Sequence, residues 1–198
     1  VTVEPFGASV EALRSTARKN GLDWRVSVVR ACVRPEGSAS ALVRRMPEDP
    51  EESAIHQVLW DLVSVPPGTQ TRSGGVEPEL VTCVRLDEVV DRRVAVMRLH
   101  TSGSELEALS SAEGLLRKGL LGAVASQFPT LPLARFLWHR GFSIELSGHP
   151  VSWGDEAGFE ATLANLPEQH HGVLVATAPL APGGKFYQTD PSLGGGGP

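Results

Sequence analysis

The sequence predicts an α+β protein: a single domain with a mixed or antiparallel sheet of about five strands packed against helices. Hydrophobic residues make up 41% of the 198 residues, which is enough for a core and too many for a wholly disordered chain. Helical and strand periodicities both occur, without the strict alternation that is typical of a parallel sheet. We expect one globular domain over residues 1–180 and a flexible Gly/Pro-rich tail over residues 181–198.

The first half of the chain opens with a predicted helix, strand and second helix. Residues 9–20 carry apolar side chains at helical spacing and end at an Asn-Gly pair. Residues 24–33 alternate like a strand but change phase near Val28, which indicates a bulge or a strand buried on both faces. An Asp-Pro pair starts a second helix over residues 49–62, and residues 68–78 have the composition of a surface loop.

Residues 80–90 and 93–100 are predicted to form a hairpin that leads into a central helix over residues 102–128. Apolar residues recur there at three- and four-residue steps, and two capping boxes allow either one helix or two helices broken near Ser110. Gly114, Gly119 and Gly122 lie within this helical pattern, and each costs about 1 kcal/mol relative to Ala in a helix. They indicate a close backbone approach by a sheet or another helix.

The last third of the predicted domain repeats short helices and strands. Thr130 can cap a helix that ends near Gly141, and residues 142–146 alternate as a strand with one buried and one solvent-facing side. An irregular bend follows, then a helix capped by Asp155 and a final strand over residues 173–178.

Cys32 and Cys83 both fall in predicted strands. Two cysteines do not make a disulfide framework in a chain of this length, so we expect buried free thiols, with one disulfide if the protein is secreted. No secretory signal is visible, and an intracellular location is expected.

Charge and motifs exclude several classes of function. The net charge of −5 leaves no basic excess for general nucleic-acid binding, and no apolar run is long enough to span a membrane. The patterns for phosphate loops, dinucleotide folds, nucleophile elbows and zinc sites are absent. We therefore expect no cofactor and no metal, and no stretch carries a recognisable family signature.

These observations favour a non-catalytic subunit or protein-interaction module of a larger assembly, bound to a protein partner or to copies of itself. The predicted contact surface is the apolar helix face with Leu116, Leu120 and Val124.

The alternative is a small enzyme or ligand-binding domain that uses histidines and carboxylates between His139 and His171. Its predicted polar cluster is His149, Asp155 and His170, because imidazole and carboxylate groups together serve in acid–base chemistry and ligand binding.

Overall fold

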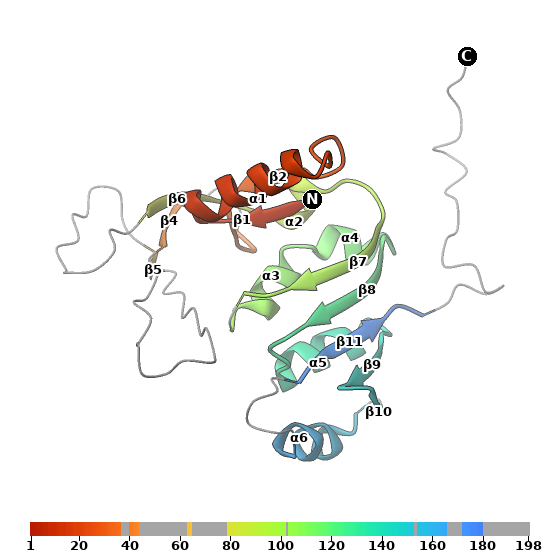
Figure 1. The fold of residues 1–198 in the computed structure, drawn as a ribbon. Helices are drawn as coiled ribbons and strands as arrows, with labels where there is room; N and C mark the ends of the chain where they lie inside the picture. Colours follow the sequence, from red (N-terminus) through yellow and green to blue (C-terminus); the bar gives the residue numbers. More distant parts are fainter. Residues whose placement is uncertain are drawn as a thin grey trace.

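The computed structural model describes residues 1–36, 40–43, 63–64, 79–101, 103–152, 154–165 and 172–179. It shows a mixed α and β protein with one five-stranded sheet and smaller sheets (Figure 1), as the sequence predicted. The elements in chain order are β1 (Thr2–Glu4), α1 (Gly7–Lys19), β2 (Val28–Arg30), β3 (Cys32–Val33), β4 (Ser40–Val43), β5 (Val63–Ser64), β6 (Glu79–Val84), α2 (Leu86–Val89), β7 (Val94–Leu99), α3 (Glu105–Ser110), α4 (Glu113–Arg117), β8 (Leu121–Ser126), α5 (Leu131–Trp138), β9 (Ser143–Leu146), β10 (His149–Val151), α6 (Glu156–Ala164) and β11 (Leu174–Thr177).

The five-stranded sheet has the order β10-β9-β11-β8-β7. Strands β7 and β8 run parallel, and the other neighbours are antiparallel. Helices α3, α5 and α6 contribute Leu109, Leu133 and Phe159 to one core, where each side chain is fully buried. Strand residues such as Val124 and Ile144 complete this core, so the helices cover one face of the sheet.

The N-terminal part of the chain forms smaller sheets beside the five-stranded one. Strand β1 pairs in parallel with β2, against which α1 packs, and a second sheet has the order β3-β6-β4-β5. At Ala31 the chain passes from pairing with β1 to pairing with β6, and the Ala31 amide still donates to the Glu4 carbonyl. This change of partner accounts for the phase change in the sequence, although the break lies three positions after Val28.

The predicted central helix is wrong beyond Arg117. Helices α3 and α4 are two short helices, and Gly119 then adopts a left-handed φ of +63°, which ends α4. The apolar residues that follow form β8, which is hydrogen-bonded to a strand on each side. Strand β8 consists mostly of apolar and small residues, and composition alone does not distinguish such a strand from a buried helix segment.

Of the three glycines, Gly122 marks a close approach by backbone, as predicted, Gly114 is approached by a side chain, and Gly119 has no atom close to it. A Cβ on Gly122 would lie 2.8 Å from the Ala95 carbonyl oxygen of β7. A Cβ on Gly114 would lie 2.8 Å from Oδ2 of Asp87. The Ser110 capping box is not formed, because the Ser110 hydroxyl donates to the Leu106 carbonyl instead.

The predicted hairpin over residues 80–100 is also wrong. Strand β6 ends at Val84, helix α2 follows, and β7 belongs to a different sheet. The sequence analysis did not predict strand β10, which pairs with β9.

Local signals in the last third of the described chain are confirmed. Thr130 accepts from the Leu133 amide at 3.3 Å, and Asp155 accepts from the Gly158 amide at 2.9 Å. Strand β9 alternates between exposed and buried residues as predicted. The predicted helix at residues 49–62 and the tail at residues 181–198 lie outside the described residues.

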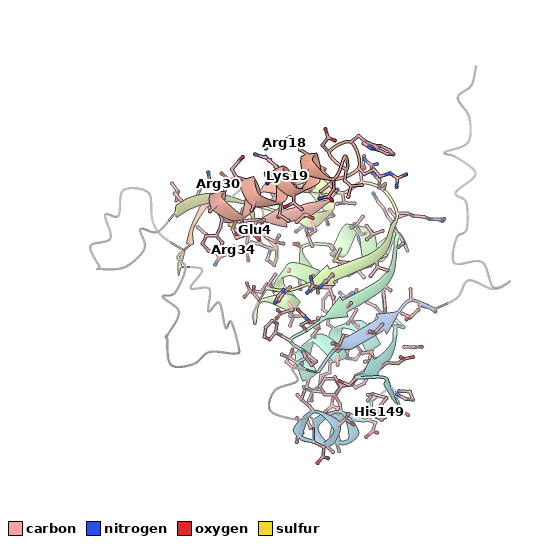
Figure 2. All side chains as sticks on the ribbon, viewed as in Figure 1. Glu4, Arg18, Lys19, Arg30, Arg34 and His149 are labelled. Carbon is pink, nitrogen blue, oxygen red and sulfur yellow. A yellow bond between two sulfur atoms is a disulfide. The ribbon has the colours of Figure 1, made fainter. Side chains whose placement is uncertain are left out.

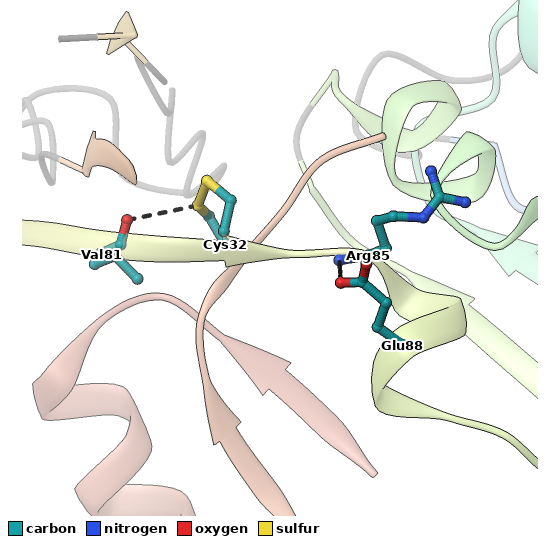
Figure 3. Close-up of a disulfide and its surroundings, with 5 residues drawn as sticks. Cys32, Val81, Arg85 and Glu88 are labelled. Atoms are coloured by element: carbon teal, nitrogen blue, oxygen red, sulfur yellow. Dashed lines mark hydrogen bonds between the residues drawn. A yellow bond between two sulfur atoms is a disulfide. The ribbon is translucent and has the colours of Figure 1, made fainter. Parts of the chain in front are cut away.

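The two cysteines form a disulfide, so the prediction of free thiols is wrong. Cys32 and Cys83 lie directly opposite each other on the parallel strands β3 and β6, and both are buried (Figure 3). The pairing depends on a register between residues 51 positions apart, which no local pattern reveals.

An ion pair at the end of β6 connects three segments. Two nitrogens of Arg85 donate to the Asp87 carboxylate at 2.9 and 2.7 Å, and Arg85 also donates to the Pro35 carbonyl. The Arg85 amide donates to the Glu88 carboxylate, which begins α2 (Figure 3). Asp87 in turn accepts from the Gly114 amide at 2.8 Å, so its negative charge lies at the N-terminus of α4, where it is favourable.

We expect the free energy of unfolding of Asp87→Asn to change less with pH in the acid range than that of the wild type. Hydrogen bonding from Arg85 holds the pKa of Asp87 below its usual 3.8. A carboxylate whose pKa is lowered by folding stabilises the fold above its unfolded pKa, and this stabilisation is lost as pH falls through the folded value. Urea unfolding between about pH 7 and pH 2 should therefore show a steeper loss below about pH 4 for the wild type than for the variant.

Asp91→Asn is the matched control, because the Asp91 side chain is 92% exposed. Its pH profile should follow that of the wild type. If the free energy of unfolding fell equally steeply at acid pH for the wild type and Asp87→Asn, the role given to this ion pair would be contradicted.

Candidate interaction surface

One face of the five-stranded sheet is not covered by the helices. Side chains alternate between the two faces of a strand, and directly paired residues on neighbouring strands share a face. The strand register therefore places two rows of residues on the side away from the core. The first row is Val96, Ala123, Thr177 and Ser143, and the second is Arg98, Ala125, Val175, Glu145 and Pro150. We call these two rows, together with Val173, the uncovered face.

Valines make the uncovered face apolar. Val96 is 63% exposed, Val175 is 37% exposed and Val173, one position before β11, is 41% exposed. Ala123 and Ala125 lie between them on β8 and are partly exposed. These short side chains leave the middle of the face low, so a second layer could approach at the usual distance of about 10 Å between packed sheets.

Two opposite charges flank the apolar centre. Arg98 lies on β7 and Glu145 on β9, and they occupy the same cross-strand row with Ala125 and Val175 between them. Three strand spacings separate the two charges, which is roughly 14 Å. Arg98 donates to Oε1 of Gln127 at 2.8 Å. Within the described part of the chain, Glu145 makes no side-chain hydrogen bond or ion pair.

The β10 edge of the sheet does not favour strand addition. Strand β10 has three residues, and its middle residue is Pro150, which has no N–H group to donate. Short edge strands with proline are typical of edges that resist pairing with another chain. At this side of the sheet, the uncovered face is therefore better suited to a partner than the edge.

The predicted contact residues Leu116, Leu120 and Val124 do not form one surface. Val124 lies on β8, points to the helix-covered face and is fully buried. Leu116 and Leu120 are partly buried and pack against two different clusters of the core. The helix face that was to carry all three is absent because residues 121–126 form a strand.

The alternative polar cluster is not assembled in the described residues. His149 is exposed on β10, the edge strand of the sheet (Figure 2). The Asp155 carboxylate caps α6 and has no hydrogen bond to His149. His170 lies outside the described residues, so the catalytic or ligand-binding alternative stays a prediction.

Sequence reasoning missed the uncovered face, although part of its signal was visible. Residues 142–146 were predicted to have a solvent-facing side, and that side carries Glu145. Along β11 the sequence gives no such signal, because the buried Leu174 and the exposed Val175 are both apolar. What no local pattern gives is the strand order that places β7, β8, β11 and β9 side by side.

Other classes of site find no support in the described ranges. No group of three or more His, Cys, Asp or Glu side chains there is arranged to hold a metal ion. The described helices are all too short or too polar to cross a membrane. Comparison of the chain with models of protein families, with curated proteins and with solved structures finds no significant match.

Proposed function

We propose that this protein is a non-catalytic interaction module, a subunit of a larger assembly that binds a protein partner through the uncovered face. The observation that carries the proposal is the exposure of Val96, Val173 and Val175 on a sheet whose other face is packed by helices. Water-exposed apolar side chains that lie together mark surfaces of association, whereas single ones are ordinary.

The energetics of this face favour a protein partner. Complete burial of a valine side chain contributes about 1.5–3 kcal/mol, so the partly exposed valines leave several kcal/mol to be gained by a second layer. The charges lie toward the sides of the face and the apolar residues at its centre. Interfaces between proteins have this arrangement, with charged residues depleted in the middle and polar groups at the rim.

The disulfide supports an assembly in an oxidising compartment. Cys32 and Cys83 are paired and buried, and a cytosolic thiol pool would work against that bond. We therefore place the interaction outside the reducing cytosol.

Photo-crosslinking tests the proposed surface. A photoreactive amino acid at position 175 should capture a protein partner in the cells that make the protein. The same group at position 13 on α1 is the matched control, because Leu13 and Val175 are each 37% exposed. We expect a product of higher mass from position 175 and little from position 13.

A second variant connects the product to the face itself. Ala125→Arg places a long charged side chain at the centre of the face and should abolish the crosslink from position 175. Its far-UV circular dichroism and thermal midpoint should stay close to those of the wild type, since Ala125 does not face the core. Equal crosslinking from positions 13 and 175, or none from either, would overturn the proposal.

A further inference from the structure

We infer that the partner of the uncovered face is a second copy of this chain, packed face to face about a twofold axis parallel to the strands. This inference rests on the proposed function and names the occupant of the same surface. Closed twofold dimers are the commonest oligomers, and their interfaces must be self-complementary. The distribution of charge and size on this face meets that requirement.

Charge gives the first argument. The second row reads Arg98, Ala125, Val175 and Glu145 across β7, β8, β11 and β9. An axis that runs along the strands midway between β8 and β11 exchanges β7 with β9. Arg98 of one copy then faces Glu145 of the other, and the pair occurs twice. Opposite charges placed across an interface fix its register.

The competing axis, perpendicular to the strands, would place β7 over β7. With that axis midway between the two rows, Arg98 of one copy would lie over Val96 of the other and Glu145 over Ser143, so neither charge would meet an opposite charge. The charges therefore select one of the two face-to-face arrangements.

Side-chain size gives a second argument that does not depend on charge. The axis along the strands places Ala125 opposite Val175, which matches a small residue with a larger one. In the first row it places Val96 opposite Ser143 and Ala123 opposite Thr177, again small against large. Interdigitated layers of this kind pack without large voids.

The area of the face indicates a weak dimer. From the usual strand spacing and rise, the face measures at most about 400 Å² per copy. A standard stable interface takes about 800 Å² from each partner. We therefore expect a dimer that dissociates at micromolar concentrations.

Sedimentation equilibrium of the purified, oxidised full chain tests the inference over about 1–500 µM. The wild type should shift from the monomer mass of 21.1 kDa toward twice that mass. Arg98→Glu or Glu145→Arg alone should weaken the dimer about tenfold or more. The double variant should return to within about threefold of the wild type, because the swapped charges again face each other.

Arg92→Glu is the matched control, since it makes the same charge change at a side chain that is 82% exposed and lies outside the uncovered face. Its dimer dissociation constant should stay within about twofold of that of the wild type. Rescue by the double variant cannot arise from misfolding of the single variants, so it separates the interface from a general loss of stability.

The outcomes distinguish this inference from the proposed function. If the protein is a monomer at every concentration and position 175 crosslinks to a different protein, the inferred dimer is wrong. The proposed function as an interaction module is then still supported. A crosslink from position 175 to residues 180–198 of the same chain would overturn both. A dimer that the charge reversals do not weaken, or that the double variant does not restore, would overturn the inferred axis.

Discussion

Replacing Cys32 and Cys83 together by alanine should lower the free energy of unfolding by about 4 kcal/mol. The disulfide joins residues 51 positions apart, so it removes much conformational freedom from the unfolded chain. In the chain-entropy account, a loop of this length corresponds to about 4 kcal/mol near room temperature. Alanine is the suitable replacement because both positions are buried and a serine hydroxyl there would add an unpaired polar group. Urea unfolding of the oxidised wild type and of the double variant measures the difference.

Reduction of the wild type provides the control for this prediction. A strong reductant should lower the stability of the wild type toward that of the double variant and leave the double variant unchanged. Without the disulfide, β3 and β6 should also separate more readily during partial unfolding, because the bond joins these two strands directly. A difference below about 1 kcal/mol would contradict the account, since even short disulfide loops are expected to contribute more.

The parts of the fold that could be predicted are those with local signals. The caps at Thr130 and Asp155 were predictable because a side-chain oxygen satisfies an amide three residues away. The alternation over residues 142–146 was predictable because the two faces of β9 meet different environments, core and solvent. In each case the sequence window contains both the signal and its cause.

The parts that failed depend on contacts between distant residues. Cys32 and Cys83 meet only because β3 and β6 align in parallel. Residues 121–126 are mostly apolar or small, as in a buried helix, and only their pairing with β7 and β11 identifies them as a strand. Helix α2 begins with the help of hydrogen bonds that the Leu86 and Asp87 amides donate to Ser111, and Ser111 lies 25 positions after Leu86.

The candidate surface was only partly predictable for the same reason. The sequence indicates that Glu145 faces solvent, but it does not indicate that Arg98 lies in the same row across β8 and β11. A self-complementary pattern is a property of the strand order, and the order follows from tertiary packing. The interaction hypothesis could therefore be framed from the sequence, whereas its surface had to come from the fold.

Gly122→Ala separates the observed strand from the predicted helix by the sign of its effect. In the interior of an exposed or loosely packed helix, the replacement would stabilise the protein by about 1 kcal/mol. In β8 the added Cβ would lie 2.8 Å from the Ala95 carbonyl oxygen, which belongs to backbone and cannot rotate away. We therefore expect a loss of about 1–3 kcal/mol in the free energy of unfolding, measured by urea denaturation.

Gly119→Ala provides an independent comparison within the same segment. No atom would lie within 4 Å of its new Cβ, but its φ of +63° is unfavourable for alanine, so the expected loss is about 1–2 kcal/mol from backbone strain alone. A continuous helix that is exposed or loosely packed at these positions predicts that both replacements stabilise, and the observed turn and strand predict that both destabilise, for different reasons. If Gly122→Ala raised the stability, β8 could not be a strand of this sheet, and the uncovered face, which needs Ala123 and Ala125 on that strand, would not exist.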